Sequence, residues 1–535
     1  MLSQRALNKM ANMRLVTLLL LFSISGFAQI DLRVKNALNA EYEHGFYFSE
    51  EQSFTAFKPS YFEPSSNDTI SGILNDNLIE YSKVNLSPSK TQSLIINPAF
   101  EFGLGRQNFE DELVSSLGLG FNLYAKRGKD KWRLGLTYLR MNSNYMQYQR
   151  EYILAQKVVP GMGVVNYDSR IGSNYLSGFL NYNANKYFNF EFGYGRNSIG
   201  DGYRSLLLSN TSNASPYFKM TTKFWKIQYT NLFTSHQHID NVERNSNLFQ
   251  RKFTATHFLD LQVTKWLNLG LFETIIWQGD KGKYNRGFDP NYLNPFIFYR
   301  PVEFSVGSSD NALVGANIKL TLPKKHILYS QVVLDEFLLS ELQADFNQWR
   351  NPNDSIRSGW WANKYGIQLG WRKFEWFGHK GFNTRLEFNF VRPFTYAHTN
   401  LNQSYSHFNQ SLAHPLGSNF TEVLGIVDYR KGKFLARAHF NFSEKGFSIL
   451  GQNLGEDIQE SNITRSKEYE NTTGQGILNK SLYSDFSLTY VWQEKWNASA
   501  SLGYIYRNQD LGPNQTNNMI YLKIHTNLFN SYFDY

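Results

Sequence analysis

Cysteine is absent from the 535-residue chain. Its absence excludes a disulfide scaffold, an iron–sulfur cluster and a thiolate zinc site, and no lipoprotein anchor is expected. Long apolar runs are also missing, because no stretch beyond residue 30 approaches the roughly 18 apolar residues that a membrane-spanning helix requires. The sequence therefore argues against a helical membrane protein.

Charged residues are few, at 19% of the chain, whereas aromatic residues make up 16%. A disordered chain has the opposite composition, being rich in charge and poor in aromatics. The chain is therefore expected to fold, and its many aromatic side chains must find an apolar environment.

The first 28 residues are typical of a secretory signal peptide. A basic start is followed by an apolar run at 15–22, and the small residues Gly26 and Ala28 mark a cleavage site. The alternative, a short anchor helix, is disfavoured because the run is too short to span a bilayer. Cleavage would remove three cations and no acid, so the formal charge of +9 would fall to +6. Secretion argues against nucleic acid as a partner, and a mild positive charge suits anionic glycan or lipid phosphate.

Apolar and polar residues alternate with a period of two through most of the chain, as in a strand that faces two environments. The alternate positions on the polar face of each strand carry Arg, Glu, Lys and Gly, which suits a water-filled barrel interior. Soluble β-sandwiches also alternate, but these segments have about ten residues, the length of a tilted membrane-spanning strand. The clearest segments are residues 188–196, 311–322, 364–373, 383–391, 434–442 and 519–529.

These features predict an all-β fold, a transmembrane antiparallel β-barrel of about 18 strands, with 16 as the alternative. Aromatic residues near strand ends would form the girdles of an outer-membrane barrel. The expected organisation is a signal peptide at 1–28, a periplasmic N-terminal segment at 29–92, and the barrel at 93–535. The last amphipathic segment, 519–529, resembles the signal read by the outer-membrane barrel assembly machinery, a partner expected during biogenesis.

Two segments depart from the period of two. Residues 30–92 contain clusters of Pro, Ser and Asn, and part of this segment could lie inside the lumen. In residues 334–349, Leu338, Leu342 and Phe346 have the i, i+4, i+8 spacing of a short amphipathic helix, although a strand through 332–339 competes equally.

Three candidate chemistries are considered and disfavoured. His398, His407 and His414 are spaced by nine and seven residues, which matches no compact metal motif. The pairs Ser404–His407 and Ser411–His414 could suggest a lipase, but no orienting acid or strained nucleophile is evident. No metal, cofactor or catalytic residue is therefore expected.

The glycine-rich stretch 193–202 superficially resembles a phosphate loop, but no helix pattern follows it. Its glycines better suit a tight turn or crowded backbone at the barrel rim. Charged residues on the polar parity are expected to form cross-strand ion pairs in the lumen, with sugar binding as the alternative. They are Glu191, Arg372, Arg385, Glu387, Arg392 and Arg437.

Several long strings together resemble the Wzi-type capsule assembly family, and within it the Bacteroidota branch of RemB-like gliding-motility surface proteins. They are GRNSIGDGYRSLLLS (195–209), NPFIFYRPVEFSVGSSDNALVGANIKL (294–320), LDEFLLSEL (334–342), WWANKYGIQLGW (360–371), EFNFVRPFTYAH (387–398) and YSHFNQSLAHPLGSNF (405–420). No such string occurs in residues 443–485, which are expected to form a long surface loop.

The resemblance implies an outer-membrane barrel of about 18 strands with a periplasmic helical element and a lectin-like, non-enzymatic role. The implied partners are outer-membrane lipid or lipopolysaccharide, surface polysaccharide and, in the gliding branch, the motility and secretion apparatus. Matching strings mark twelve candidates for polysaccharide binding or for structuring the lumen: Asp201, Arg204, Arg300, Glu303, Asp310, Asp335, Glu336, Glu387, Arg392, His398, His407 and His414.

Three functions follow from the sequence. The favoured one is an outer-membrane protein that attaches or organises capsular or exopolysaccharide, with a role in gliding. The alternatives are a diffusion porin, suggested by the wide polar barrel, and a barrel lipase that uses Ser404 or Ser411.

Overall fold

The computed structural model describes most of the chain beyond residue 91. The described residues are 47–48, 54–58, 92–107, 112–128, 131–164, 166–167, 170–239, 249–281, 284–295, 310–351, 357–493, 498–512, 514–526 and 532–535. The expected signal peptide lies outside these ranges, as does most of the expected N-terminal segment.

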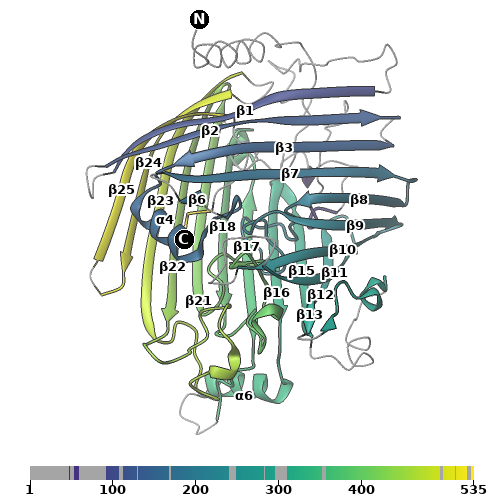
Figure 1. The fold of residues 1–535 in the computed structure, drawn as a ribbon, viewed down its shortest axis with the longest axis vertical. Helices are drawn as coiled ribbons and strands as arrows, with labels where there is room; N and C mark the ends of the chain where they lie inside the picture. The colour runs from purple at the N-terminus through teal and green to yellow at the C-terminus, as the bar shows by residue number, and fades with distance from the viewer. Residues whose placement is uncertain are drawn as a thin grey trace, which may run out of the picture.

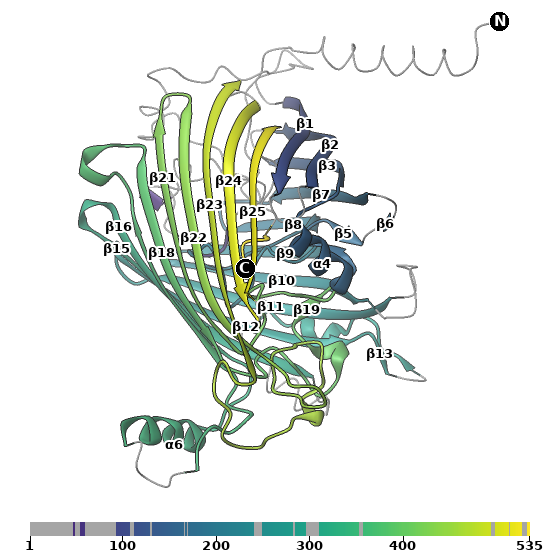
Figure 2. The same ribbon diagram turned by 90° about the vertical axis from the view of Figure 1, so that its left-hand side faces the viewer.

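Eighteen long strands form a single antiparallel sheet that closes on itself (Figures 1 and 2). A two-residue strand, β6 (Asn166–Tyr167), adds to its edge beside β7. In their order around the wall, the long strands are β1 (Gln92–Gln107), β2 (Glu112–Arg127), β3 (Trp132–Ser143), β7 (Ile171–Asn183), β8 (Phe188–Gly195), β9 (Ser215–Phe224), β10 (Ile227–His238), β11 (Gln250–Gln262), β12 (Leu267–Gln278), β15 (Asn311–Leu322), β16 (His326–Leu334), β17 (Tyr365–Lys373), β18 (Phe382–Val391), β21 (Phe420–Lys431), β22 (Phe434–Phe447), β23 (Ile477–Gln493), β24 (Ala498–Asp510) and β25 (Asn514–His525).

The wall closes where β25 pairs with β1. Residues Glu101 to Gln107 of β1 lie opposite Met519 to His525 of β25 in antiparallel register. Every other pair of neighbours is also antiparallel and consecutive around the wall. The prediction of a closed barrel of about 18 strands is therefore confirmed.

Alternation along each strand separates an apolar outer face from a polar inner face. In β18, Leu386 and Phe388 are 50% and 38% exposed, whereas Glu387 and Asn389 are 2% and 0% exposed. Burial is reversed relative to a soluble protein, because the apolar face has no protein neighbour. A surface of this kind requires lipid. Other large apolar side chains on the exposed face are Leu104, Leu119, Phe192, Leu369, Leu502, Ile520 and Leu522.

Some inward charges pair across strands as predicted. Lys219 lies opposite Glu191 with Nζ 2.8 Å from Oε1, and Arg437 lies opposite Asp428 with Nε 2.6 Å from Oδ1. Arg372 lies opposite Arg385 instead, so these two inward charges do not form a cross-strand pair with each other.

The two ends of the barrel differ strongly in the length of their connections. Eight connections of two to eight residues lie at one end, and the other end has the long connections together with two short ones, 108–111 and 511–513 (Figure 2). The β1 start and the β25 end lie at the short-turn end. In outer-membrane barrels short turns face the periplasm and long loops face outward, which orients the molecule.

Two α-helices occur among the described residues, α4 (Gln147–Gln156) and α6 (Leu339–Arg350). Both belong to connections of the long-loop end, so neither of them is the periplasmic helical element that the resemblance implies. The helix predicted within 334–349 is confirmed, and the competing strand ends at Leu334. Of the described helices, none has the length and apolarity needed to cross a bilayer.

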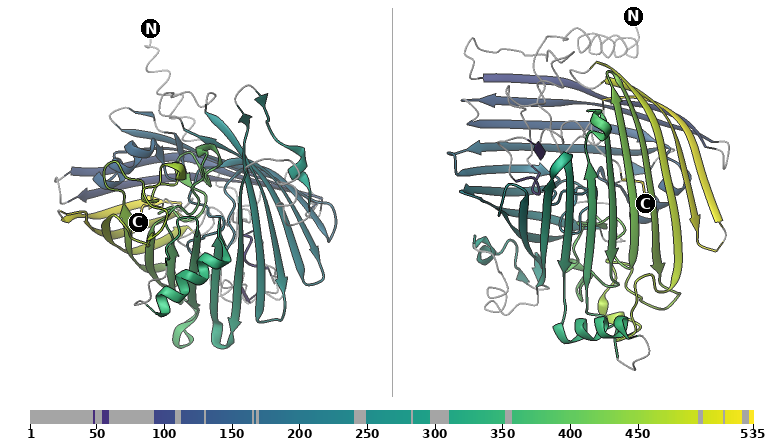
Figure 3. Two further views of the ribbon diagram at one scale, coloured as in Figure 1. Left: turned by 90° about the horizontal axis from the view of Figure 1, so that it is seen from below. Right: turned by 180° about the vertical axis from the view of Figure 1, so that it is seen from behind.

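Two sequence-based boundaries were wrong. Residues 443–485 are a loop only from 448 to 476, because β22 continues to Phe447 and β23 begins at Ile477. The final strand, expected at 519–529, is β25 and ends at His525. Residues 532–535, which we call the tail, lie near the middle of the barrel rather than at the end of its wall (Figure 3).

Candidate functional site in the barrel lumen

Two long connections, 196–214 and 392–419, fold back into the lumen, and we call them together the plug. The Tyr405 hydroxyl of one connection donates to the Leu207 carbonyl of the other across 2.8 Å. Apolar side chains of the plug pack against apolar residues on the inner wall, which makes a core inside the barrel. This core includes Ile199, Leu206, Leu207, Leu232, Phe258, Phe272, Leu313, Tyr396, Leu412 and Phe420.

Glycine is required where the plug backbone crowds the wall. Gly200 has a φ of 137°, a backbone conformation that residues other than glycine rarely adopt. A Cβ at Gly202 would lie 2.7 Å from the Arg204 carbonyl oxygen and 3.0 Å from Gln368 Oε1. The crowding predicted for 193–202 is confirmed, although it occurs within the lumen as well as along the wall.

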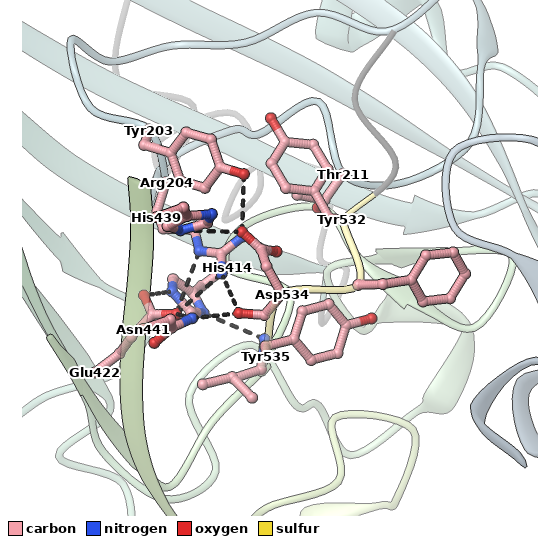
Figure 4. Close-up of polar contacts among 12 residues, drawn as sticks. Tyr203, Arg204, Thr211, His414, Glu422, His439, Asn441, Tyr532, Asp534 and Tyr535 are labelled. Atoms are coloured by element: carbon pink, nitrogen blue, oxygen red, sulfur yellow. Dashed lines mark hydrogen bonds and ion pairs between the residues drawn. The ribbon is translucent and has the colours of Figure 1, made fainter. Parts of the chain in front are cut away.

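A buried cluster of charges joins the plug, the wall and the tail (Figure 4). The Arg204 guanidinium bonds to Glu422 Oε1 of β21 at 3.1 Å and to Asp534 Oδ1 of the tail at 3.1 Å. Asn441 of β22 donates to the same Glu422 oxygen at 2.7 Å, and His414 Nε2 donates to the other at 2.7 Å. Four segments distant in the sequence therefore meet at one point.

The charge cluster is enclosed by rings and is largely dehydrated. Tyr203 and Tyr532 lie with their ring centroids 5.1 and 5.6 Å from the Arg204 guanidinium carbon, and the Tyr203 hydroxyl donates to Asp534. Burial would lower the pKa of Arg204, but Asp534 and Glu422 outweigh burial and hold that pKa well above its usual value. Arg204 is therefore a fixed cation that holds two carboxylates in the lumen.

Glu387 of β18 holds the chain that leads into Arg204. Its carboxylate accepts hydrogen bonds from the Arg204 backbone N–H at 3.1 Å, from the Tyr203 backbone N–H, and from the Tyr329 hydroxyl at 2.6 Å. An inward wall carboxylate thus fixes backbone rather than pairing across strands.

Asp201 ties residues 54–58 to the plug. The Thr55 hydroxyl donates to Asp201 Oδ1 at 2.7 Å and accepts from Lys319 Nζ at 2.7 Å, while Lys58 Nζ lies 3.7 Å from the same Asp201 oxygen. Burial opposes ionisation of Asp201, but Lys58 and Lys319 hold its pKa below the usual value. A stretch before the barrel is thus anchored in the lumen.

Asp310 links the connection after β12 to the plug. Its carboxylate accepts from Arg286 at 2.9 Å, from the Tyr292 hydroxyl at 2.7 Å and from Gln403 Nε2 at 3.0 Å. The same Arg286 also pairs with Asp289 at 2.7 Å.

Asp335, Glu336 and Arg392 hold the outer connections to the wall. Asp335 accepts from the Tyr396 backbone N–H at 2.8 Å, and Glu336 pairs with Lys364 at 3.2 Å. Arg392 lies 3.5 Å from Asp345 of α6 and donates to backbone carbonyls of neighbouring loops. The other two candidates, Arg300 and Glu303, lie outside the described residues.

The three histidines have separate partners. His398 Nδ1 accepts from the Asn400 backbone N–H at 3.2 Å, His407 bonds to backbone groups of Gln237 and Ala214, and His414 bonds to Glu422. Within the described part of the chain, no group of three or more His, Asp or Glu side chains is placed to hold a metal ion.

The two serine–histidine pairs are not assembled for catalysis. His407 donates to the Ala214 carbonyl and accepts from Gln237, so both ring nitrogens point away from Ser404. His414 bonds to Glu422 and to the Leu416 backbone N–H rather than to Ser411. Ser404 is instead an acceptor for the buried Lys252 Nζ at 3.3 Å.

Acidification is expected to loosen the plug through its buried neutral histidines. Burial lowers the pKa of His407 from about 6.5 to about 4, with Lys252 adding to the shift against the bond to Ala214. A proton therefore binds the unfolded chain first, and stability is lost as pH falls from about 6.5 towards 4, by about 2 kcal/mol at pH 5.

The test is to unfold the purified barrel in urea at pH 7.5 and at pH 5 and to compare the urea concentrations at the two midpoints. His407→Gln retains one donor and one acceptor without titrating, so it should shrink the difference between the two midpoints. An unchanged difference in that variant would show that His407 does not titrate during unfolding.

The sequence did not single out Tyr203, Glu422, Asn441 or Asp534. Glu422 escaped notice because Phe420 and Leu424 share its inward parity, so the polar alternation of β21 is broken. Asp534 lies beyond the last strand and carries no periodic signal at all.

The chain matches no protein-family model. A search of curated proteins likewise finds no relative. Among solved structures, the fold is similar to that of Wzi from Escherichia coli, described as an outer-membrane protein involved in group 1 capsule assembly and a carbohydrate-binding β-barrel. The identity is 12% and the TM-score 0.52, over 92% of this chain and 99% of Wzi.

Similarity is lower to two outer-membrane proteins of Pseudomonas aeruginosa. OccK1 (OpdK) has 9% identity and a TM-score of 0.42, over 82% of this chain and 98% of its own. OprD has the same identity and TM-score, over 82% of this chain and 94% of its own. The similarity to Wzi, at so low an identity, bears on the fold alone.

Proposed function

We propose that this protein is an outer-membrane barrel that binds surface polysaccharide at its outer end and catalyses no reaction. The observation that carries the proposal is the occupied lumen, in which Arg204 and His414 are 1% and 0% exposed. A ligand that arrives from outside would meet the long connections before any channel.

Aromatic rings paired with arginines at the outer end supply a suitable surface. The Arg357 guanidinium carbon lies 3.5 Å from the Tyr469 ring centroid, and that of Arg465 lies 4.2 Å from the Trp361 ring centroid. Flat rings stack on sugar faces, and guanidinium groups bind uronate or phosphate bidentately. We call these four residues the outer aromatic patch.

The twelve sequence-based candidates have a different role in this proposal. Ten of them are described, and their bonds to plug, wall and backbone support a role in structuring the lumen rather than in binding glycan directly. Membership of the RemB-like branch, a role in gliding, and contacts with the motility, secretion and barrel assembly apparatus belong to the same proposal and rest on the sequence resemblance.

Glycan binding by the purified full-length protein tests this function. Wild type should bind at least one polysaccharide of an immobilised panel, and the double change Arg357→Ala, Tyr469→Ala should weaken binding about tenfold by removing a stacking face and its cation. Tyr187→Ala, at the short-turn end, is the matched control and should bind normally. A panel that gives no binding to wild type would refute the proposal.

A substrate-selective channel is the second candidate. A small cavity lies between the plug and the wall, lined by polar residues such as Arg196, Asn213 and His236 and by apolar residues such as Leu208 and Leu232. In planar bilayers a plugged binding protein should be nearly silent, whereas steady current through wild type would favour the channel.

A further inference from the structure

Cations are concentrated in the short turns of the barrel. Seven of the eight turns carry exposed lysine or arginine within their described residues, in the turn or within two residues of it. Lys495 of the eighth turn is outside the described ranges. We call the exposed cations the basic rim: Arg127, Lys131, Lys186, Lys223, Lys265, Lys324, Lys380, Lys431 and Lys433.

Acidic residues are few in the same turns, where the sequence holds Asp130, Glu375 and Glu494. In the described parts of these seven turns and the two residues on either side, the one acid is Glu375, whose carboxylate pairs with Lys325 at 2.6 Å. Two of the long connections have the opposite balance: 448–476 holds five acids and two cations, and 335–364 holds five acids and three cations. The short turns are therefore more basic than these two connections, and they lie at the periplasmic end of the wall.

Exposed aromatic side chains fix the depth of the basic rim in the bilayer. Trp225, Trp266 and Phe377 are 76%, 53% and 83% exposed at the short-turn end. Lys226 Nζ lies 5.6 Å from the Trp225 ring centroid, and Lys186 Nζ lies 4.9 Å from that of Tyr187. Tryptophan and tyrosine mark the membrane interface, so the neighbouring lysines reach the level of the lipid phosphates.

We propose that the basic rim binds anionic phospholipid head groups of the inner leaflet and so selects the lipids around the short-turn end. The turns occur at intervals around the whole wall, which suits a ring of separate head groups better than one compact ligand. Their attraction adds from lysine to lysine and weakens with ionic strength. This binding is independent of polysaccharide recognition at the outer end.

Lipid selectivity of the full-length protein in vesicles tests the inference. Phosphatidylcholine vesicles would contain either brominated phosphatidylglycerol or brominated phosphatidylcholine, each of which quenches tryptophan fluorescence on contact. Wild type should favour phosphatidylglycerol about threefold at low salt, and this preference should fall in 0.5 M salt.

A variant with four rim substitutions and a control variant with the same loss of charge elsewhere distinguish an effect of the basic rim from an effect of net charge. Lys186, Lys223, Lys265 and Lys380 changed to Gln should bring the preference close to one. The same change at Arg170, Arg350, Lys467 and Lys480, at the outer end, removes equal charge and should leave the preference intact. Faster migration of unheated protein in gels would show that each variant is folded.

Two results would overturn the inference. One is a preference that is absent in wild type or unaffected by the four rim substitutions. The other concerns binding of the detergent-solubilised protein to soluble polygalacturonate. If the four rim substitutions abolish that binding and leave lipid selectivity unchanged, the rim binds an anionic glycan instead.

Discussion

Replacing Arg204 by methionine should release the plug and open the barrel to ions. The change leaves Glu422 and Asp534 as buried carboxylates, with side chains 0% and 7% exposed, and without their cation. Removing one partner of a buried pair typically costs about 3–5 kcal/mol, more than the plug can absorb without rearranging. Steady conductance in planar bilayers and a lower urea midpoint are the expected results.

Removing the two carboxylate charges as well should reverse the effect of Arg204→Met. The triple variant Arg204→Met, Glu422→Gln, Asp534→Asn has no unpaired charge, so it should regain low conductance and much of the lost stability. Arg437→Met breaks an ion pair within the wall and should leave the barrel closed to ions. An Arg204→Met barrel that conducts no ions and unfolds at the wild-type urea midpoint would contradict the assigned role of the cluster.

Replacing Asp201 by alanine should detach residues 54–58 from the lumen. The change leaves Lys319 and Lys58 without their carboxylate and removes the acceptor of the Thr55 hydroxyl. Chymotrypsin cleaves after phenylalanine, and Phe57 is only 5% exposed because it packs in the core inside the barrel. Cleavage after Phe57 should become at least about tenfold faster, because a buried charge cluster is worth about 3 kcal/mol or more.

Mass spectrometry of the chymotryptic fragments measures this rate. Asp201→Asn keeps an acceptor for Thr55 without the charge, so its rate should fall between those of wild type and Asp201→Ala. Asp310→Ala, which disturbs the outer connections instead, should cleave at the wild-type rate. Equal rates in all four proteins would show that Asp201 does not anchor this stretch.

The strands of the wall could be predicted from the sequence because the alternation of each strand depends on its own residues and on the two environments that it faces. A strand between lipid and a wet lumen must alternate, and segments such as β15 and β18 alternate clearly enough to be placed within a residue. Alternation fails where the inner face meets the plug: in β12, Phe272, Ile275 and Ile276 are all buried, so neither parity is polar. These strands have an apolar neighbour on both sides.

The plug could not be predicted because its contacts are not periodic and join distant segments. Arg204 and Glu422 are 218 residues apart, and Arg204 and Asp534 are 330 apart. Resemblance to known proteins drew attention to Arg204, but nothing in the sequence identified its partners. Residues Asp201, Glu387 and His414 were chosen in the same way, and the structure gives each of them specific contacts within the lumen.

The closing seam sets an order of events for assembly. Within the described part of the chain, β1 pairs with β25 from Glu101 to Gln107, whereas β1 pairs with β2 from Gln92 to Gln107. The tail follows β25 in the chain, yet it lies inside against Arg204. It must therefore enter before the wall seals or thread through the short-turn end afterwards. Closure of the wall and docking of the tail are thus coupled: if the wall seals first, Arg204 has Glu422 as its one carboxylate partner until the tail threads into the lumen.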